Sequence, residues 1–152
     1  SPIVSILSDN IFETDIDEYL NQTEDSIFDE DNLYKGPDGK KYKRRVYINS
    51  VIDTNYLIFY AQRLKEGNKR LYTKITPNET LTLPNDKVLK LNAVVVHKSL
   101  HYVCYIKCNN SWFYYNDMSD KIEYVGNYKD MISNEENRPD VCKEGVLYFY
   151  SL

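Results

Sequence analysis

The pattern of apolar and polar residues predicts that most of this chain forms β-strands. Residues 55–64 are nearly all apolar, which fits a strand buried on both faces, and another strand-like run follows at 88–97. Two further runs, 101–108 and 111–116, are separated only by Asn109-Asn110. Asparagine tolerates positive φ angles, so this pair predicts a two-residue hairpin turn.

Other elements are expected to be short. Thr14 is a candidate N-cap, and Ile16, Tyr19 and Leu20 follow it at helical spacing, which predicts a first helix. A second helix is expected from about Asn127 to Ser133. Additional strands are predicted at 42–48, after the Gly-Pro-Asp-Gly turn at 36–39, and at 69–76, 79–84, 121–125 and 145–152. No internal repeat or linker divides the chain, so we expect one β-rich α+β domain with two short helices.

Composition adds a preference for protein contacts. The chain has 15 Tyr, 5 Phe and 1 Trp among 152 residues, and its formal net charge is −4. Tyrosine favours strands and half-wet contact surfaces. The basic stretch 40–45 surrounds Tyr42 and could touch phosphates, but it also fits a solvated strand whose charge is balanced by the acidic segment 24–31. We therefore expect no nucleic-acid partner.

The cysteines and the apolar runs suggest where the protein resides. The 3 Cys are odd in number and lack metal-ligand spacing, which indicates reduced thiols in an intracellular protein of the cytoplasm or nucleus. The apolar runs are too short to span a membrane, and no signal peptide begins the sequence. We expect no membrane association.

The hairpin carries the candidate chemistry. If Cys108 lies opposite Ser111, then His101 lies on the same face of the sheet as Asn116, one diagonal step away and within side-chain reach. An amide oxygen there could accept a hydrogen bond from the imidazole and fix its tautomer. The alternative is an ordinary strand histidine with a satisfied neighbour, which is also how we interpret His97.

Cys104 and Cys108 lie on the opposite face in this register. Neither can act as nucleophile for His101 without a change of register, and we expect both to be core thiols.

Together these motifs resemble the C-terminal part of the ubiquitin-specific protease (USP) family of cysteine deubiquitinases. That family has an apolar strand ending in His, then Gly-His-Tyr, a second strand with Trp-x-x-Phe-Asp/Asn-Asp, and a closing apolar-aromatic strand. Residues 54–64 are similar to the Pro-x-x-Leu-x-hydrophobic-x-Leu-x-Arg-Phe strand of the family, and 15–54 resemble its fingers segment. The matching hairpin positions are His101, Tyr102, Trp112, Tyr115, Asn116 and Asp117.

The resemblance implies a single USP-like domain over 1–152, with a fingers-like segment at about 1–54 and an antiparallel palm-like sheet at about 55–152. It implies that His101 is the general base, that Asn116 orients it and that Asp117 supports the site. From the same motifs, Tyr102, Trp112 and Tyr115 are expected to contact a binding partner.

The departures from the family pattern are as informative. The family's nucleophile box, roughly Gly-Asn-Thr-Cys-Tyr-x-Asn-Ser, has no counterpart, and the oxyanion-hole Asn is missing with it. Gly36 and Gly39 replace the second pair of zinc-binding cysteines, so no metal or other cofactor is expected. The loop before the histidine, which lines the channel for the ubiquitin tail in the family, is shortened to 98–100.

Three functions fit these features. The first is a catalytically incomplete pseudo-deubiquitinase that binds ubiquitin, a ubiquitin-like protein or another protein. The second is the His/Asn-bearing half of a cysteine deubiquitinase whose Cys-bearing half is another chain or a missing segment. The third is a docking subunit of a complex without ubiquitin contact, with a homodimer as a variant. The isolated chain is predicted not to hydrolyse ubiquitin conjugates, because a His/Asn pair without a thiol has nothing to deprotonate.

Overall fold

A computed structural model describes residues 3–6, 13–20, 34–35, 41–42, 54–65, 67, 69–83, 85–98, 100–119, 121–133 and 137–152. The predicted acidic segment, the Gly-Pro-Asp-Gly turn and most of the predicted strand at 42–48 lie outside these residues. The fingers-like assignment of 1–54 therefore remains a prediction.

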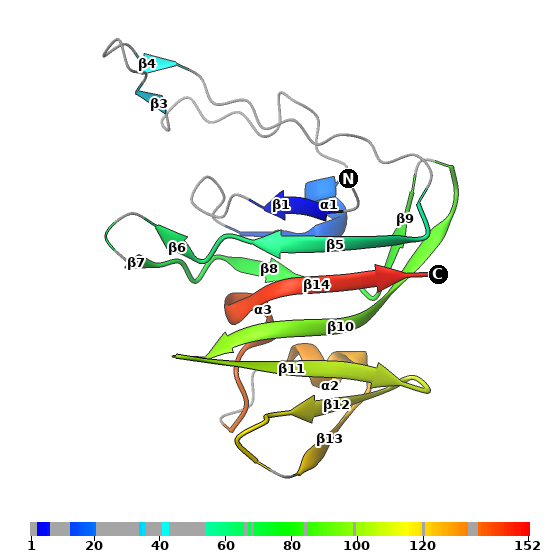
Figure 1. The fold of residues 1–152 in the computed structure, drawn as a ribbon. Helices are drawn as coiled ribbons and strands as arrows, with labels where there is room; N and C mark the ends of the chain where they lie inside the picture. Colours follow the sequence, from blue (N-terminus) through cyan, green and yellow to red (C-terminus); the bar gives the residue numbers. More distant parts are fainter. Residues whose placement is uncertain are drawn as a thin grey trace.

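One large sheet dominates the described structure (Figure 1). Its strand order is β1-β5-β14-β10-β11-β12-β13, and β9 pairs with the start of β10. Its strands are β1 (Ile3–Ile6), β5 (Tyr56–Ala61), β9 (Thr80–Thr82), β10 (Val88–Lys98), β11 (His101–Cys108), β12 (Ser111–Tyr115), β13 (Ile122–Gly126) and β14 (Gly145–Ser151). The prediction of a β-rich domain is confirmed.

The sheet is mixed rather than purely antiparallel. The pairing of β1 with β5 is parallel, whereas β5, β14, β10, β11, β12 and β13 pair antiparallel. A parallel pair needs a long crossover connection, which the pattern of single strands does not reveal. The prediction of an antiparallel sheet is therefore wrong for this one edge.

The remaining elements are small. Three two-stranded sheets pair β2 (Glu13–Asp15) with β8 (Lys74–Thr76), β3 (Tyr34–Lys35) with β4 (Lys41–Tyr42), and β6 (Leu64–Lys65) with β7 (Lys69–Arg70). The described helices are α1 (Ile16–Leu20), α2 (Tyr128–Ile132) and α3 (Val141–Glu144).

The first two helices occur where the sequence predicted them. Asn127 caps α2 through a reciprocal capping box with Asp130. Thr14 does not cap α1, because it lies in β2 and its hydroxyl donates to the Asp15 carbonyl; instead the N–H of Asp17 donates to Asn78 Oδ1 at 2.8 Å. The third helix, α3, was not predicted.

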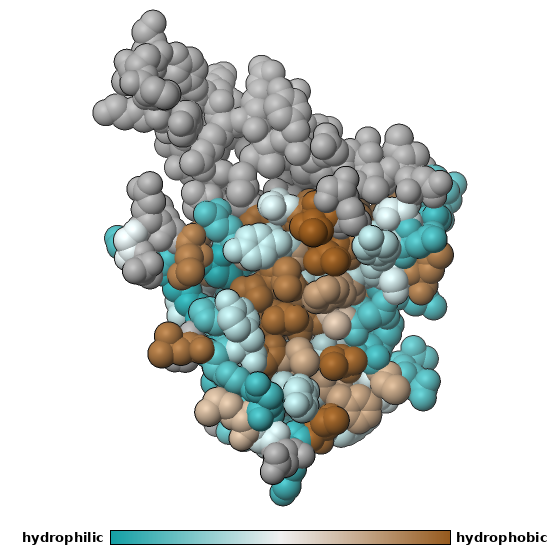
Figure 2. Space-filling view, viewed as in Figure 1, coloured by the Kyte–Doolittle hydropathy of each residue, from teal (hydrophilic) through white to brown (hydrophobic). Residues whose placement is uncertain are grey.

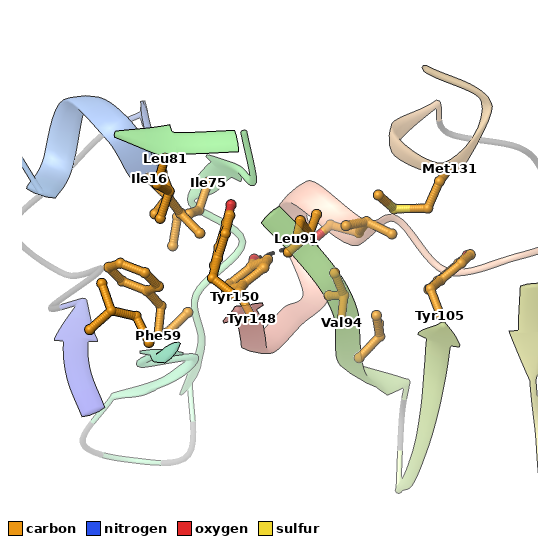
Figure 3. Packing of buried hydrophobic residues seen from close by; sticks show 14 of the residues in the cluster. Ile16, Phe59, Ile75, Leu81, Leu91, Val94, Tyr105, Met131, Tyr148 and Tyr150 are labelled. Atoms are coloured by element: carbon orange, nitrogen blue, oxygen red, sulfur yellow. Dashed lines mark hydrogen bonds between the residues drawn. The ribbon is translucent and has the colours of Figure 1, made fainter. Parts of the chain in front are cut away.

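The helices pack on one face of the sheet, behind it as viewed in Figure 1. Figure 3 shows Ile16 of α1 beside Ile75 and Leu81, above Phe59, and Met131 of α2 above Tyr105. Buried tyrosines tie this core to neighbouring loops: the Tyr105 hydroxyl donates to the Pro139 carbonyl at 2.8 Å. Burial removes an aromatic ring from water while the hydroxyl keeps a partner, which accounts for part of the tyrosine content.

Only this one face of the sheet is fully buried. Along β5, Leu57, Phe59 and Ala61 are buried, whereas Tyr56 and Tyr60 on the other face are 51% and 45% exposed. The prediction of a strand buried on both faces is therefore wrong for β5.

Candidate functional site

The β11–β12 hairpin has the predicted register. Cys108 pairs with Ser111 and Tyr105 with Tyr114. Asn109 and Asn110 adopt φ angles of 49° and 65°, which is the backbone of a type I′ turn. This register brings the first residue of β11 beside the residue that follows β12.

His101 and Asn116 are in contact as predicted. His101 Nε2 lies 2.8 Å from Asn116 Oδ1 and 2.9 Å from Asp117 Oδ1. The side chain of His101 is 29% exposed and that of Asp117 is 66% exposed. The three polar residues therefore form a cluster that solvent, or a partner, can reach.

The cluster fixes the tautomer of the imidazole. The backbone N–H of Met118 also donates to Asn116 Oδ1, at 3.0 Å, so this oxygen is an acceptor. An acceptor facing Nε2 requires that Nε2 carries the proton. The lone pair is then on Nδ1, where the ring can accept a proton or a hydrogen bond.

None of the three cysteines of the chain is recorded as a partner of His101, and all three lie within the described residues. Cys104 is half-buried, Cys108 is exposed beside the hairpin turn, and Cys142 is buried in α3. Burial raises the pKa of the Cys104 and Cys142 thiols, which is opposite to the shift that activates a nucleophile.

The prediction of two core thiols on β11 is therefore wrong. The alternation along β11 correctly predicted that Cys104 and Cys108 lie on the opposite face of the sheet from His101. It does not indicate which of the two faces the helices cover. The covered face carries Val103 and Tyr105, and the cysteines are on the other.

A pocket of about 270 Å³ opens near this end of β11. Its lining includes Tyr60, Leu64, Val95, His97, Tyr102 and Leu147. The rings of His97 and Tyr102 stack with centroids 4.6 Å apart, because the two residues pair across β10 and β11.

The sequence predicted a structural role for His97, and this pocket was not predicted from it. A signal for the pocket was nonetheless present in the sequence. The run 88–97 ends in His97, and Tyr102, which follows His101, pairs with His97 in the neighbouring strand. Burial, with the guanidinium of Arg70 as a second cause, lowers the pKa of His97, which favours a neutral imidazole. Arg70 also donates to the His97 carbonyl.

The three predicted binding residues differ in exposure. Tyr102 is 61% exposed and Tyr115 is 40% exposed, whereas Trp112 is only 1% exposed. Trp112 points into the core, because it alternates with Ser111 and Phe113 along β12. Of the three, Tyr102 and Tyr115 present surface to a partner, while Trp112 contributes packing.

Gly36 and Gly39, which replace zinc-binding cysteines in the resemblance, lie outside the described residues. Within the described ranges no group of three or more His, Cys, Asp and Glu side chains is placed to hold a metal ion. No helix in the described part of the chain is long and apolar enough to cross a membrane.

Comparison of the chain with models of known families and with curated proteins gives no match.

Proposed function

We propose that this chain is a catalytically incomplete USP-like domain that acts by binding a protein: ubiquitin, a ubiquitin-like protein or another partner. One observation carries the proposal: His101 is oriented by Asn116 and Asp117, yet no cysteine of the chain is a recorded partner of its imidazole. An oriented base without a thiol supports recognition, not nucleophilic catalysis.

The opposite face of the sheet at this end of β11 supports protein binding. Tyr102 follows His101 in the chain, so its side chain points to the other face of the sheet, where it lines the pocket together with Leu64 and Leu147. Exposed tyrosines around an apolar pocket are typical of sites where a few aromatic residues supply most of the binding energy. The three free cysteines fit a protein kept in the reducing interior of the cell, and we place its partner there.

A second function is favoured by the contacts of Nε2 with Asn116 and Asp117, which leave Nδ1 as the acceptor of the ring. If another chain or segment brings a cysteine to this nitrogen, Nδ1 takes the thiol proton and the thiolate attacks the isopeptide carbonyl. The proton then passes to the leaving lysine amine as the C–N bond breaks, and water hydrolyses the resulting thioester. In this alternative, the chain is the His/Asn half of a cysteine deubiquitinase.

The test combines binding and turnover on one sample. We would titrate the unlabelled chain into ¹⁵N-labelled ubiquitin, follow amide shifts, and add a fluorogenic substrate linked to the ubiquitin C-terminus. We expect concentration-dependent shifts without turnover. Tyr102→Ala should weaken binding about tenfold or more, as expected when a central aromatic residue is truncated.

Two controls make the result specific. Tyr56→Ala removes a tyrosine of similar exposure, 51%, at the opposite end of β5 from Tyr60, and should leave the affinity unchanged. Turnover by the wild-type chain that disappears in His101→Ala would overturn the proposal. An absence of shifts would restrict the partner to a protein other than ubiquitin, and equal loss in both tyrosine variants would refute the pocket as the contact.

A further inference from the structure

The face of the large sheet turned away from the helices carries two unbroken rows of side chains. The paired residues place each row across all seven strands from β1 to β13, and the register shifts of the β10–β14 and β12–β13 pairs lie just outside the rows. The first row is Ile3, Ile58, Phe149, Ala93, Ile106, Phe113 and Tyr124. The second is Ser5, Tyr60, Leu147, Val95, Cys104, Tyr115 and Ile122.

Neither row contains a charged residue, and only Ser5 is not apolar or aromatic. An antiparallel sheet with one solvated face normally alternates apolar residues inward with polar residues outward. Here the second face is nearly as apolar as the first. The strands are thus patterned for burial on both sides, although the described helices cover only one.

Figure 2 shows the result from this side: an apolar patch lies over the middle of the sheet, with paler and hydrophilic residues around it. The centre of the patch is formed by half-buried residues such as Phe149 and Val95, and its periphery by more exposed ones. An apolar centre within a more polar rim is the usual anatomy of a protein interface.

We propose that this face binds a second copy of the chain, by packing sheet against sheet. The area suits a stable dimer. Eight side chains on the face are between 40% and 66% exposed: Ile3, Tyr56, Tyr60, Tyr102, Ile106, Tyr115, Ile122 and Tyr124. At about 200 Å² for each large side chain they present roughly 850 Å², close to the ~800 Å² that each partner buries in a standard interface.

The arrangement of the strands fits two-fold symmetry. β10 is the fourth of seven strands in the sheet order, so a two-fold axis that runs parallel to β10 between the two facing sheets places β14 of one copy over β11 of the other. The residues at this axis, Ala93 and Val95, are small. They leave room for the larger Phe149 and Ile106 on either side to interdigitate, as the inner faces of a β-sandwich do.

Charge also favours a second copy. Two copies joined through these rows bury no charged group, so their association pays no desolvation penalty for an unpaired ion. The dimer face includes the pocket-lining residues Tyr60, Val95 and Leu147, so a second copy and a partner bound at the pocket would compete for it. Ile106 lies in the first row and outside the pocket lining, so variants at this position test dimerisation separately from the proposed function.

The test is the mass of the full chain in solution, measured by sedimentation equilibrium over a range of concentrations. We expect the wild-type chain to approach twice its chain mass as concentration rises. Ile106→Glu and Ile106→Lys should each shift the dissociation constant at least a hundredfold toward monomer. Position 106 is 46% exposed, so a charged side chain there can stay hydrated in the monomer but not in the dimer.

Leu100→Glu is the matched control. It adds the same charge at an apolar position that is 99% exposed and outside both rows, and it should leave dimerisation unchanged. Tyr124→Glu, at the end of the first row, provides a second test if the variants at 106 lose their native circular dichroism. A wild-type chain that stays monomeric at every concentration would overturn the proposal. So would a dimer unaffected by folded row variants, or one weakened equally by Leu100→Glu.

Discussion

Arg63 allows the clearest prediction of the effect of a single buried side chain. It is 2% exposed, and its guanidinium donates hydrogen bonds to four acceptors, none of which is a carboxylate. Nε donates to the Gly145 carbonyl at 2.8 Å, and Nη1 donates to the Thr73 carbonyl. Nη2 donates to the Cys142 carbonyl at 3.0 Å and to the Tyr148 hydroxyl at 3.3 Å. One guanidinium thus joins the end of β5, the segment before β8, and the junction of α3 with β14.

The size of the effect follows from the groups left behind. Arg63→Met keeps most of the aliphatic stem but deprives three backbone carbonyls of a charged donor. Each buried polar group without a partner costs about 1–3 kcal/mol, and relief of the buried charge offsets part of the sum. We expect a loss of about 4 kcal/mol. The total stability of a chain of this length is on the order of 8–20 kcal/mol, so the loss is a large fraction of it.

The assay uses the single tryptophan of the chain. Trp112 is 1% exposed, so its emission reports unfolding in a urea titration, and the change in midpoint at constant slope gives the change in free energy. Arg63→Lys should lose a comparable amount, because one ammonium cannot reproduce the fork of donors.

Arg70→Met is the control for Arg63. Its side chain is 15% exposed, its ion pair with Glu144 is long, at 3.9 Å, and it donates to one backbone carbonyl, that of His97, where Arg63 donates to three. We therefore expect a loss nearer 1 kcal/mol. A loss below about 1 kcal/mol in Arg63→Met, or equal losses at the two arginines, would refute the reasoning.

Three further predictions concern titration and thiol access. Burial raises the pKa of Tyr148 to about 12. The folded state therefore retains a proton that the unfolded state loses above pH 10, so the free energy of unfolding should fall by up to about 3 kcal/mol between pH 10 and 12. In urea titrations across that range, the free energy of unfolding of Tyr148→Phe should fall less. Burial and a neighbouring guanidinium lower the pKa of His97, so the stability that its neutral imidazole contributes should be lost as pH falls below 6.5. Below pH 6.5 the melting temperature of His97→Gln should therefore fall less steeply than that of the wild-type chain, and an equal slope would contradict this. Cys108 is exposed, Cys104 half-buried and Cys142 buried, so a thiol reagent should modify them in that order, and labelling of Cys142 at the rate of Cys108 in the native protein would disprove the assigned burial.

The candidate site was predictable because its determinants are local. His101 and Asn116 are 15 residues apart, and a two-residue Asn-Asn turn with period-two alternation fixes their register. The cap of α2 is local in the same way. By contrast, α3 is only four residues long, and its signal, an Asp140 N-cap with a nearby Glu144, is easy to miss in a polar stretch.

What the sequence by itself determined was most strands of the large sheet, the hairpin and the pairing of an imidazole with an amide. The sequence did not predict β1, and the strand predicted at 69–76 is divided into β7 and β8. What only the tertiary structure decided was which side of each strand is covered. Alternation divides a strand into two faces, but the packing of helices selects the buried one, and this placed Trp112 in the core and Cys104 and Cys108 outside it. Contacts between distant parts of the chain also pair β1 with β5, and they bring backbone carbonyls from three segments close to Arg63. Contacts between segments many residues apart depend on how the whole chain collapses, and no local pattern encodes them.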